Sequence, residues 1–208
     1  MCGALERLLD GVFARSPLPV SIKTRIGYTR PDEFDRLLDV FARYPIHELI
    51  IHPRTRVEFY KGIPHREAFA KAHAALDRPL CYNGDLFCEG DCRELMRQFP
   101  NTRALMLGRG LIANPALAQS LGGGEALCKA SLRAFHDRLL AAYQAKYPAH
   151  VTLGRMREIA KHFVCCFDAP EKPRKAIRKA TRIDAYLDAI DRLFEEHELN
   201  ENPRFIAE

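Results

Sequence analysis

The sequence of 208 residues predicts an α/β protein in which parallel strands alternate with helices, followed by an all-helical segment. Short apolar runs recur at intervals of 25 to 31 residues over about the first 120 positions, and stretches of helical periodicity fill the intervals. Continuous apolar strands between amphipathic helices are typical of parallel β/α units, because the sheet is buried on both faces. After the three glycines at 122–124 the pattern changes, and no convincing strand follows.

The elements of the first part follow from these patterns in chain order. Each apolar run is four or five residues long, the length of a buried strand, and an amphipathic stretch follows each of the first three runs. We predict strands at 18–22, 48–51, 79–82 and 104–107, and helices at 32–44, 66–76 and 90–99.

The second part predicts a small helical domain of three or four helices joined by short turns that contain Pro and Gly. We place the boundary at the glycines, which divides the chain into domains 1–121 and 122–208. The helical stretches are 129–147, 152–167, 173–181 and 182–199.

The composition excludes several classes of protein. The chain is 47% hydrophobic and 28% charged, which is ordinary for a globular protein, and no apolar run approaches the ~20 residues of a membrane span. The N-terminus lacks the basic start and apolar centre of a signal peptide, so we expect a cytoplasmic protein that does not bind membranes. The seven cysteines lack the paired C-x-x-C spacing of a zinc site, and we expect reduced, packed thiols and no metal.

Positive charge is concentrated in one segment. The formal net charge is +5, and residues 155–182 contain nine Lys and Arg against three acidic residues. A basic face of this kind favours a polyanionic partner, although charge alone is equally compatible with a solvated helix surface.

Each predicted strand ends in polar residues. The four endings read "KTRIG", "HPRTR", "NGD" and "GRG". Because the carboxyl ends of parallel strands meet at one edge of the sheet, these endings predict a binding site there.

Four β/α units do not close a barrel, which needs eight. The "GRG" that opens a helix after the last strand is similar to the phosphate cradle of barrel strands seven and eight. We therefore expect strands five to eight of a barrel, with the first half upstream or supplied by a partner. An open doubly wound sheet is the alternative that the loop contents disfavour.

The motifs "PVSIKTRIG", "LIIHPRTRVEFYKG", "PLCYNGD" and "ALMLGRGLIANP", in this order and spacing, resemble the tRNA-dihydrouridine synthases. The resemblance is strong over about 18–120 and weaker over the tail. It implies the C-terminal portion of an FMN-binding TIM barrel, with about four β/α units followed by a helical tRNA-binding domain, in a protein that is a monomer at full length. It also implies reduction of uridine to 5,6-dihydrouridine in tRNA, with FMN as cofactor and NADPH or NADH as reductant.

The resemblance assigns roles at the first two strand ends. Lys23 would lie beside the pyrimidine edge of the flavin, where an ammonium stabilises charge that develops on reduction. His52 would contact the flavin and shape the uridine pocket together with Arg54 and Thr55. Alternatively, Lys23 is a lysine extending from a strand end and His52 is structural. Pro53 stands where many members of the family have glycine, so a backbone N–H contact at that position is lost.

The other two strand ends also match the family. Asn83, Gly84 and Asp85 resemble a turn that allows close approach of the cofactor and orients it, although Asn-Gly is also simply a good turn signal. Gly108 and Arg109 resemble the grip on the FMN phosphate, with a backbone N–H and a bidentate guanidinium.

In this family the helical tail holds the tRNA, and the basic segment fits because phosphate contacts provide most sequence-independent affinity. The candidates, which the sequence does not rank, are Arg155, Arg157, Lys161, Arg174, Lys175, Arg178 and Lys179.

One departure from the family concerns catalysis. The catalytic cysteine of the family lies in a "GCP"-like loop after an earlier strand, and this sequence contains no such loop. The catalytic residue is therefore unknown, and we expect a truncated chain that is inactive alone. Two other functions stay open: a tRNA- or RNA-binding remnant without catalysis, and another phosphate-gripping FMN barrel oxidoreductase.

Overall fold

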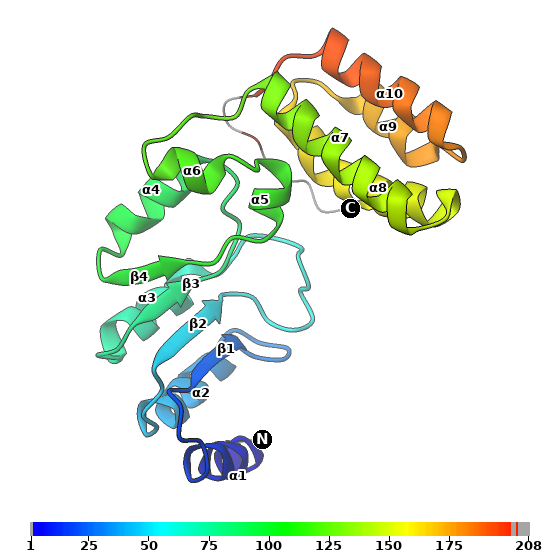
Figure 1. Cartoon of the computed structure of the whole chain (residues 1–208). Helices are drawn as coiled ribbons and strands as arrows, with labels where there is room; N and C mark the ends of the chain where they lie inside the picture. Colours follow the sequence, from blue (N-terminus) through cyan, green and yellow to red (C-terminus); the bar gives the residue numbers. More distant parts are fainter. Residues whose placement is uncertain (1, 201–202, 204–208) are drawn as a thin grey trace. The chain divides into compact units, whose positions relative to one another are not determined.

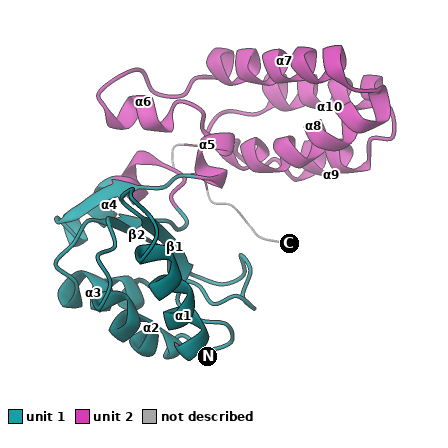
Figure 2. Cartoon of the chain, turned by 60° about the horizontal axis from the view of Figure 1, so that its bottom comes forward, with its two compact units in different colours: residues 1–85, 93–107, 207 teal, residues 86–92, 108–206, 208 magenta. Residues whose placement is uncertain are grey.

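The computed structural model describes residues 2–200 and residue 203, and these form two compact units that Figure 2 shows in different colours. Unit 1 contains the described residues up to 85 together with 93–107. Unit 2 contains residues 86–92 and the described residues from 108 onward. The borders between the two units therefore lie at positions other than residue 122. The division into domains 1–121 and 122–208 stays a prediction. Residues 201, 202 and 204–208 of the second predicted domain lie outside the described residues.

Unit 1 is built on a four-stranded sheet in which all neighbours are parallel, which confirms the predicted α/β arrangement. The strands follow one another in chain order across the sheet (Figure 1). Parallel neighbours need a crossover connection, and a helix follows each of the first three strands. The strands are β1 (Ser21–Arg25), β2 (Glu48–His52), β3 (Leu80–Tyr82) and β4 (Thr102–Leu105).

The first strand begins three residues later than predicted. Pro17 and Pro19 have no N–H to give to a ladder, and the pairing starts where the N–H of His47 donates to the Val20 carbonyl at 2.9 Å. The prediction that Lys23 follows the strand is therefore wrong, because Lys23 lies inside β1. The prediction for the fourth strand is two residues too late.

The two faces of the sheet differ. Side chains alternate along each strand, so Leu49, Ile51, Leu80 and Tyr82 share one face, and all four are buried. Helices α2 and α3 cover this face (Figure 1), and Phe69 of α3 packs edge-on against Tyr82 with ring centroids 5.0 Å apart. The other face carries Lys23, Ile50, Cys81 and Ala104 in register across the four strands, and we call it the Lys23 face.

The helices that follow the strands are amphipathic, as predicted. In α2 the buried residues Phe34, Leu38 and Phe41 recur at helical spacing, so one stripe of the helix faces the core. Helix α4 begins in unit 2 and ends in unit 1. The bounds are α1 (Cys2–Phe13), α2 (Glu33–Ala42), α3 (Arg66–Ala75) and α4 (Glu89–Gln98).

Unit 2 is helical over the described residues from 108 onward, apart from an isolated antiparallel bridge between Phe167 and Leu199. None of the described helices is both long enough and apolar enough to cross a bilayer. The helices are α5 (Arg109–Ala113), α6 (Leu117–Leu121), α7 (Lys129–Lys146), α8 (Ala149–Phe163), the 3-10 turn η1 (Val164–Cys166), α9 (Glu171–Lys179) and α10 (Ile183–Glu196).

The four long helices α7–α10 share one hydrophobic core, which includes Met156, Phe163 and Ile190. His136 is completely buried in it, and one ring nitrogen lies 3.0 Å from the Tyr186 hydroxyl. Burial lowers the pKa of His136, and its other ring nitrogen lies 2.8 Å from an Asp137 carboxylate oxygen, so both ring nitrogens have partners within unit 2.

Candidate functional site

Asn83, the residue after β3, joins the carboxyl ends of β2 and β4 to that of β3. Its backbone N–H donates to the Ile51 carbonyl at 2.9 Å, and its Nδ2 donates to the Met106 carbonyl at 2.8 Å. The side chain therefore ties the end of β3 to the residue that follows β4. Its predicted role in orienting a ligand stays a prediction, and the amide oxygen and the second N–H of Nδ2 are the side-chain groups that could serve it.

Two residues with predicted roles, Lys23 and His52, share the Lys23 face. Arg25 pairs with His52, and Lys23 lies two residues before Arg25, so all three side chains alternate onto the same side. Burial lowers the pKa of Lys23, and the nearby Arg25 charge lowers it further. Burial also raises the pKa of the Cys81 thiol to about 11, so this neighbour stays neutral. His52 is buried, with its ring 6.2 Å from the Tyr60 ring.

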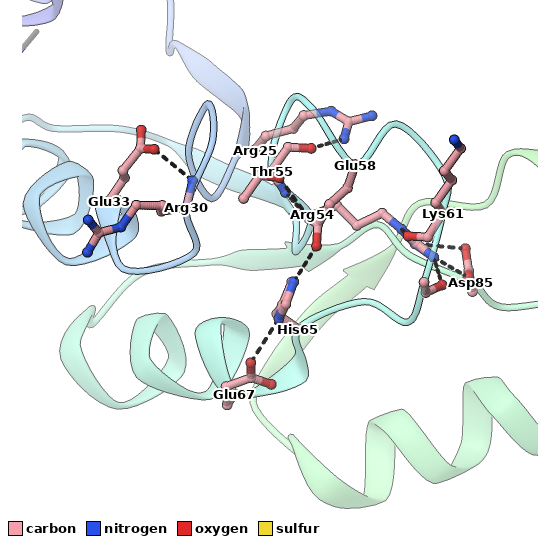
Figure 3. Close-up of polar contacts among 11 residues, drawn as sticks. Arg25, Arg30, Glu33, Arg54, Thr55, Glu58, Lys61, His65, Glu67 and Asp85 are labelled. Atoms are coloured by element: carbon pink, nitrogen blue, oxygen red, sulfur yellow. Dashed lines mark hydrogen bonds and ion pairs between the residues drawn. The ribbon is translucent and has the colours of Figure 1, made fainter.

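Arg54 is the second residue of the loop between β2 and α3 (Figure 3), and its side chain is the largest that is fully buried among the described residues. Its Nη2 donates to an Asp85 carboxylate oxygen at 2.8 Å and to the Gly62 carbonyl at 2.6 Å. Its Nε donates to the Lys61 carbonyl at 3.4 Å. The guanidinium thus holds the far side of its own loop and the residue after the Asn-Gly turn. The prediction that Arg54 contacts the substrate stays untested, and the structure uses its polar atoms internally.

The same loop contains a second polar group around Glu58 (Figure 3). One carboxylate oxygen accepts from the N–H of Thr55 at 2.5 Å and from its hydroxyl at 2.9 Å. The other lies 2.7 Å from Nε2 of His65. The hydrogen bond to Glu58 raises the pKa of His65. Burial raises the pKa of Glu58, but the bonds from His65 and Thr55 outweigh it and the net shift is downward.

Sequence analysis missed Arg25. Its guanidinium donates to the carbonyls of Thr55 at 2.6 Å and Phe59 at 3.0 Å, and so fixes the loop after β2 to β1. It also lies over the Tyr60 ring, 5.9 Å from the centroid. The period of two in "KTRIG" could have found it, because that period puts Arg25 on the same face as Lys23.

The position of the Tyr82 side chain explains why residue 84 is glycine. A Cβ there would lie 2.6 Å from the Tyr82 hydroxyl oxygen and 2.7 to 2.8 Å from its ring carbons. The position of Tyr82 therefore leaves no room for a side chain at residue 84. Approach of a cofactor at Gly84, the predicted reason, stays a prediction. The next residue, Asp85, is held by Arg54.

The loop after β1 is fixed by Glu33 (Figure 3). Its carboxylate accepts from the backbone N–H groups of Tyr28, Thr29 and Arg30 at 2.8 to 3.0 Å. These bonds lower the pKa of Glu33 to about 2. The carboxylate is therefore charged throughout the neutral range, where it can accept all three bonds.

Gly108 and Arg109 belong to unit 2. A Cβ on Gly108 would meet nothing within 4 Å, so the backbone there faces open space. The Arg109 guanidinium carbon lies 5.6 Å from the centroid of the Phe87 ring. Burial, together with the charges of Lys161 and Arg109, lowers the pKa of His162 in α8 to about 4.

The basic residues of the tail line a groove between α8 and α9. It has a volume of about 510 Å³, and it gathers five of the seven predicted tRNA-binding residues. Lys175 and Lys179 are exposed on α9 but do not line the groove. The lining of this α8–α9 groove is His150, Val151, Gly154, Arg155, Arg157, Glu158, Lys161, Val164, Arg174, Ile177 and Arg178.

A parallel sheet with connecting helices, followed by a basic helical part, makes this an α/β protein, a class in which ligands commonly bind at the carboxyl edge of the sheet. The family model described as dihydrouridine synthase matches residues 4–194, and the chain belongs to that family.

Several curated proteins are similar to this chain. A tRNA-dihydrouridine(16) synthase of Pseudomonas putida is 29% identical over 68% of this chain and 45% of its own length. A probable tRNA-dihydrouridine synthase of Rhodobacter capsulatus is 28% identical over 92% of this chain and 61% of its own length. A probable tRNA-dihydrouridine synthase 2 of Bacillus subtilis is 37% identical over 47% of this chain and 31% of its own length. The chain thus spans about one third to three fifths of the length of these relatives.

Proposed function

We propose that this protein reduces uridine to 5,6-dihydrouridine in tRNA, with FMN as cofactor and NADPH or NADH as reductant. The observation that carries the proposal is the family match over residues 4–194. The relatives described above are named for this reaction on tRNA. The protein then belongs among oxidoreductases that modify tRNA, and the cytoplasmic location stays a prediction.

The proposed fold of the whole protein is a TIM barrel followed by a helical domain. The four strands would be its C-terminal β/α units, with domains at 1–121 and 122–208. Among the described strands, β1 and β4 each have a single neighbour, as expected for part of a sheet that closes on further strands.

Lys23 and His52 are the proposed contacts to the flavin ring. When bound, FMN supplies hydride transfer to the uridine base. Lys23 is an exposed ammonium on the Lys23 face whose pKa is lowered by partial desolvation, and there it would stabilise negative charge on the pyrimidine edge of the ring. His52 is buried on the same face and would hydrogen-bond a flavin oxygen and border the uridine pocket.

The turn of Asn83, Gly84 and Asp85 is proposed to bound the cofactor site. Asn83 would orient the cofactor through its amide oxygen or its second amide N–H, while the other N–H donates to the Met106 carbonyl and fixes the side chain. Arg54 and Thr55 would act on the substrate by shaping the loop after β2, because their polar atoms bond within it.

Gly108 and Arg109 are the proposed phosphate contacts. The residues fit a phosphate group, because the open space at Gly108 leaves its backbone accessible and Arg109 offers a bidentate donor pair. Replacing Arg109 with alanine should weaken FMN binding at least about tenfold, since charge-assisted bidentate bonds are strong. The matched control is Arg103→Ala, at an exposed arginine of β4. Equal FMN affinity of the two variants in fluorescence titrations would remove Arg109 from the site.

The seven basic residues of α8 and α9 are the proposed tRNA contacts. The proton donor for the uridine base is not assigned to any residue of this chain, since its sequence contains no "GCP"-like loop. The chain of 208 residues is accordingly proposed to be inactive alone.

The decisive experiment uses the protein in the form that its own cells make. We expect it to show flavin absorbance and to form dihydrouridine on unmodified tRNA with NADPH or NADH. A colourless protein that ignores added FMN would overturn the proposal. Dihydrouridine formed by the isolated 208-residue chain would contradict its inactivity alone.

An RNA-binding protein without catalysis is the second candidate. The α8–α9 groove favours it, because this groove lies entirely within unit 2 and needs no flavin. Binding of tRNA without any binding of FMN would establish this alternative.

A further inference from the structure

The α8–α9 groove combines two kinds of surface. Its base is apolar, with Val164 and Ile177 buried beneath it and Val151 half-buried at its side. Its walls carry four arginines and one lysine, against Glu158 as the only acidic residue in the lining. An apolar base under cationic walls suits a ligand with a flat apolar part and an anionic part.

Gly154 keeps the groove open. It lies in the middle of α8, where glycine is a poor helix former, and an added Cβ would meet nothing within 4 Å. Because Gly154 also lines the groove, a longer side chain at this position would project into it.

The size of the groove limits its occupant. A volume of about 510 Å³ lies in the range of ~300 to 1,000 Å³ that small-molecule sites occupy. A double helix would contact the exposed rim, whereas a single unstacked nucleotide has the dimensions to enter. Arginine guanidinium planes stack on unstacked bases, and arginine binds phosphate with two parallel hydrogen bonds.

We infer that the α8–α9 groove is a subsite for one unstacked nucleotide of the bound tRNA. Its base lies on Val151, Gly154 and Ile177, and its flanking phosphates contact the arginines of the walls. This inference rests on the proposed tRNA substrate. It adds the place in the tail where a nucleotide of the tRNA binds and the contacts that hold that nucleotide. It separates the five basic residues in the groove from Lys175 and Lys179, which supply charge outside it.

The first test compares two pairs of charges on the same helix. Arg174→Ala/Arg178→Ala should weaken binding of a single-stranded oligoadenylate at least about tenfold and reduce the slope of log K against log[salt] by about 1.4, about 0.7 for each lost contact. Lys175→Ala/Lys179→Ala removes the same charge from α9 outside the groove and should weaken binding less than about threefold. Oligoadenylate contains no uridine, so its binding does not depend on a uridine site.

The second test fills the groove without changing any charge. Gly154→Leu should weaken oligoadenylate binding about fivefold while leaving the salt slope unchanged, since no phosphate contact is removed. Gly154→Ala is the matched control and should bind as the parent does. Circular dichroism and thermal unfolding of each variant show whether the helices are intact. This arm decides the question if Arg174→Ala/Arg178→Ala fails to fold.

The outcomes separate this inference from the proposed function. An equal loss of oligoadenylate affinity in both double variants, with no effect of Gly154→Leu, would show a diffuse basic face. It would overturn the groove as a nucleotide subsite and leave the proposed tRNA binding in place. Failure of the parent chain to bind any tRNA would instead remove the tail's part in the proposed function. Binding of AMP or NADPH in the groove more tightly than oligoadenylate would mark a free-nucleotide site. Equal competition by polyglutamate would mark an acidic protein ligand, and both results would overturn the inference.

Discussion

The loop at residues 53–65 and the α8–α9 groove are both rich in charge, but they use it in opposite ways. In the loop, Arg54 is completely buried and the carboxylate of Glu58 is bound from two sides. In the groove, Arg155 and Arg178 are exposed on the helix surface. The first region uses charge to fix its own backbone, whereas the second leaves charge exposed on the helix surface. A residue type alone therefore does not tell a ligand-binding arginine from a structural one.

The largest effect should come from breaking the loop at Arg54. In Arg54→Ala the carbonyls of Lys61 and Gly62 lose their donor and Asp85 loses its counter-charge, so the free energy of unfolding should fall by about 3 kcal/mol. Urea unfolding monitored by circular dichroism measures it. Arg30→Ala removes an exposed arginine whose ion pair with Asp32 is also exposed, and should change little. A small effect of Arg54→Ala would mean that the two regions do not differ as described.

Two glycines sharpen the comparison, because alanine should act on them with opposite sign. Gly62 in the loop has φ of +69°, and Gly62→Ala should destabilise the protein by about 1 kcal/mol. Gly154 lies in a helix with open space around it, and Gly154→Ala should stabilise by up to about 1 kcal/mol. Thermal unfolding of both variants compares them. The same sign for both would contradict this account of the glycines.

The His65–Glu58 pair should make the stability of the loop depend on pH. The pKa of His65 is raised above 6.5, so its contribution is complete below that value and is lost as pH rises through the folded pKa. The pKa of Glu58 is lowered below 4.5, so its contribution is present above that value and is lost as pH falls through the folded pKa.

The stability difference between the parent and His65→Gln should therefore be largest between pH 4.5 and 6.5, at up to about 1 kcal/mol, and should shrink on both sides. Urea midpoints across this range measure it. A stability difference that stays constant with pH would show that His65 and Glu58 do not titrate as described.

The smallest effect on stability should come from the groove. Arg155 forms an ion pair with Glu158 at 3.3 Å, and both side chains are more than 60% exposed. Arg155→Ala should change the free energy of unfolding by less than about 0.5 kcal/mol. In the same variant, filter binding should show weaker affinity for tRNA. A larger loss of stability than of affinity would place Arg155 with the structural arginines.

The sequence predicted the repeated β/α pattern well because hydrophobic periodicity is a local property. The strand at 48–51 differs from β2 by one residue, whereas the first strand was misplaced because Pro17 and Pro19 interrupt an otherwise apolar run. That the polar endings gather at one site stays a prediction, since Lys23 lies inside β1 and Arg109 belongs to unit 2. That Lys23 and His52 share a face required the pairing register, which no local pattern contains.

The partners of individual side chains could not be predicted. Arg54 bonds to Asp85, 31 residues away, and only the folded chain brings them together. Likewise, helical periodicity placed seven basic residues on helices but did not rank them. The packing of α9 on α8 separates Arg174 and Arg178 from Lys175 and Lys179.

The small apolar cluster of Phe87, Ala113 and Cys166 in unit 2 has a consequence for chimaeras. Phe87 and Ala113 come from the segments after β3 and β4, whereas Cys166 comes from the tail, and its thiol lies 3.2 Å from the Ala113 carbonyl oxygen. Exchanging tails between relatives at residue 122 would therefore split this cluster and leave α5 against a foreign surface. A graft that keeps the parent's contacts has to carry residues 86–92 and 108–121 along with the tail.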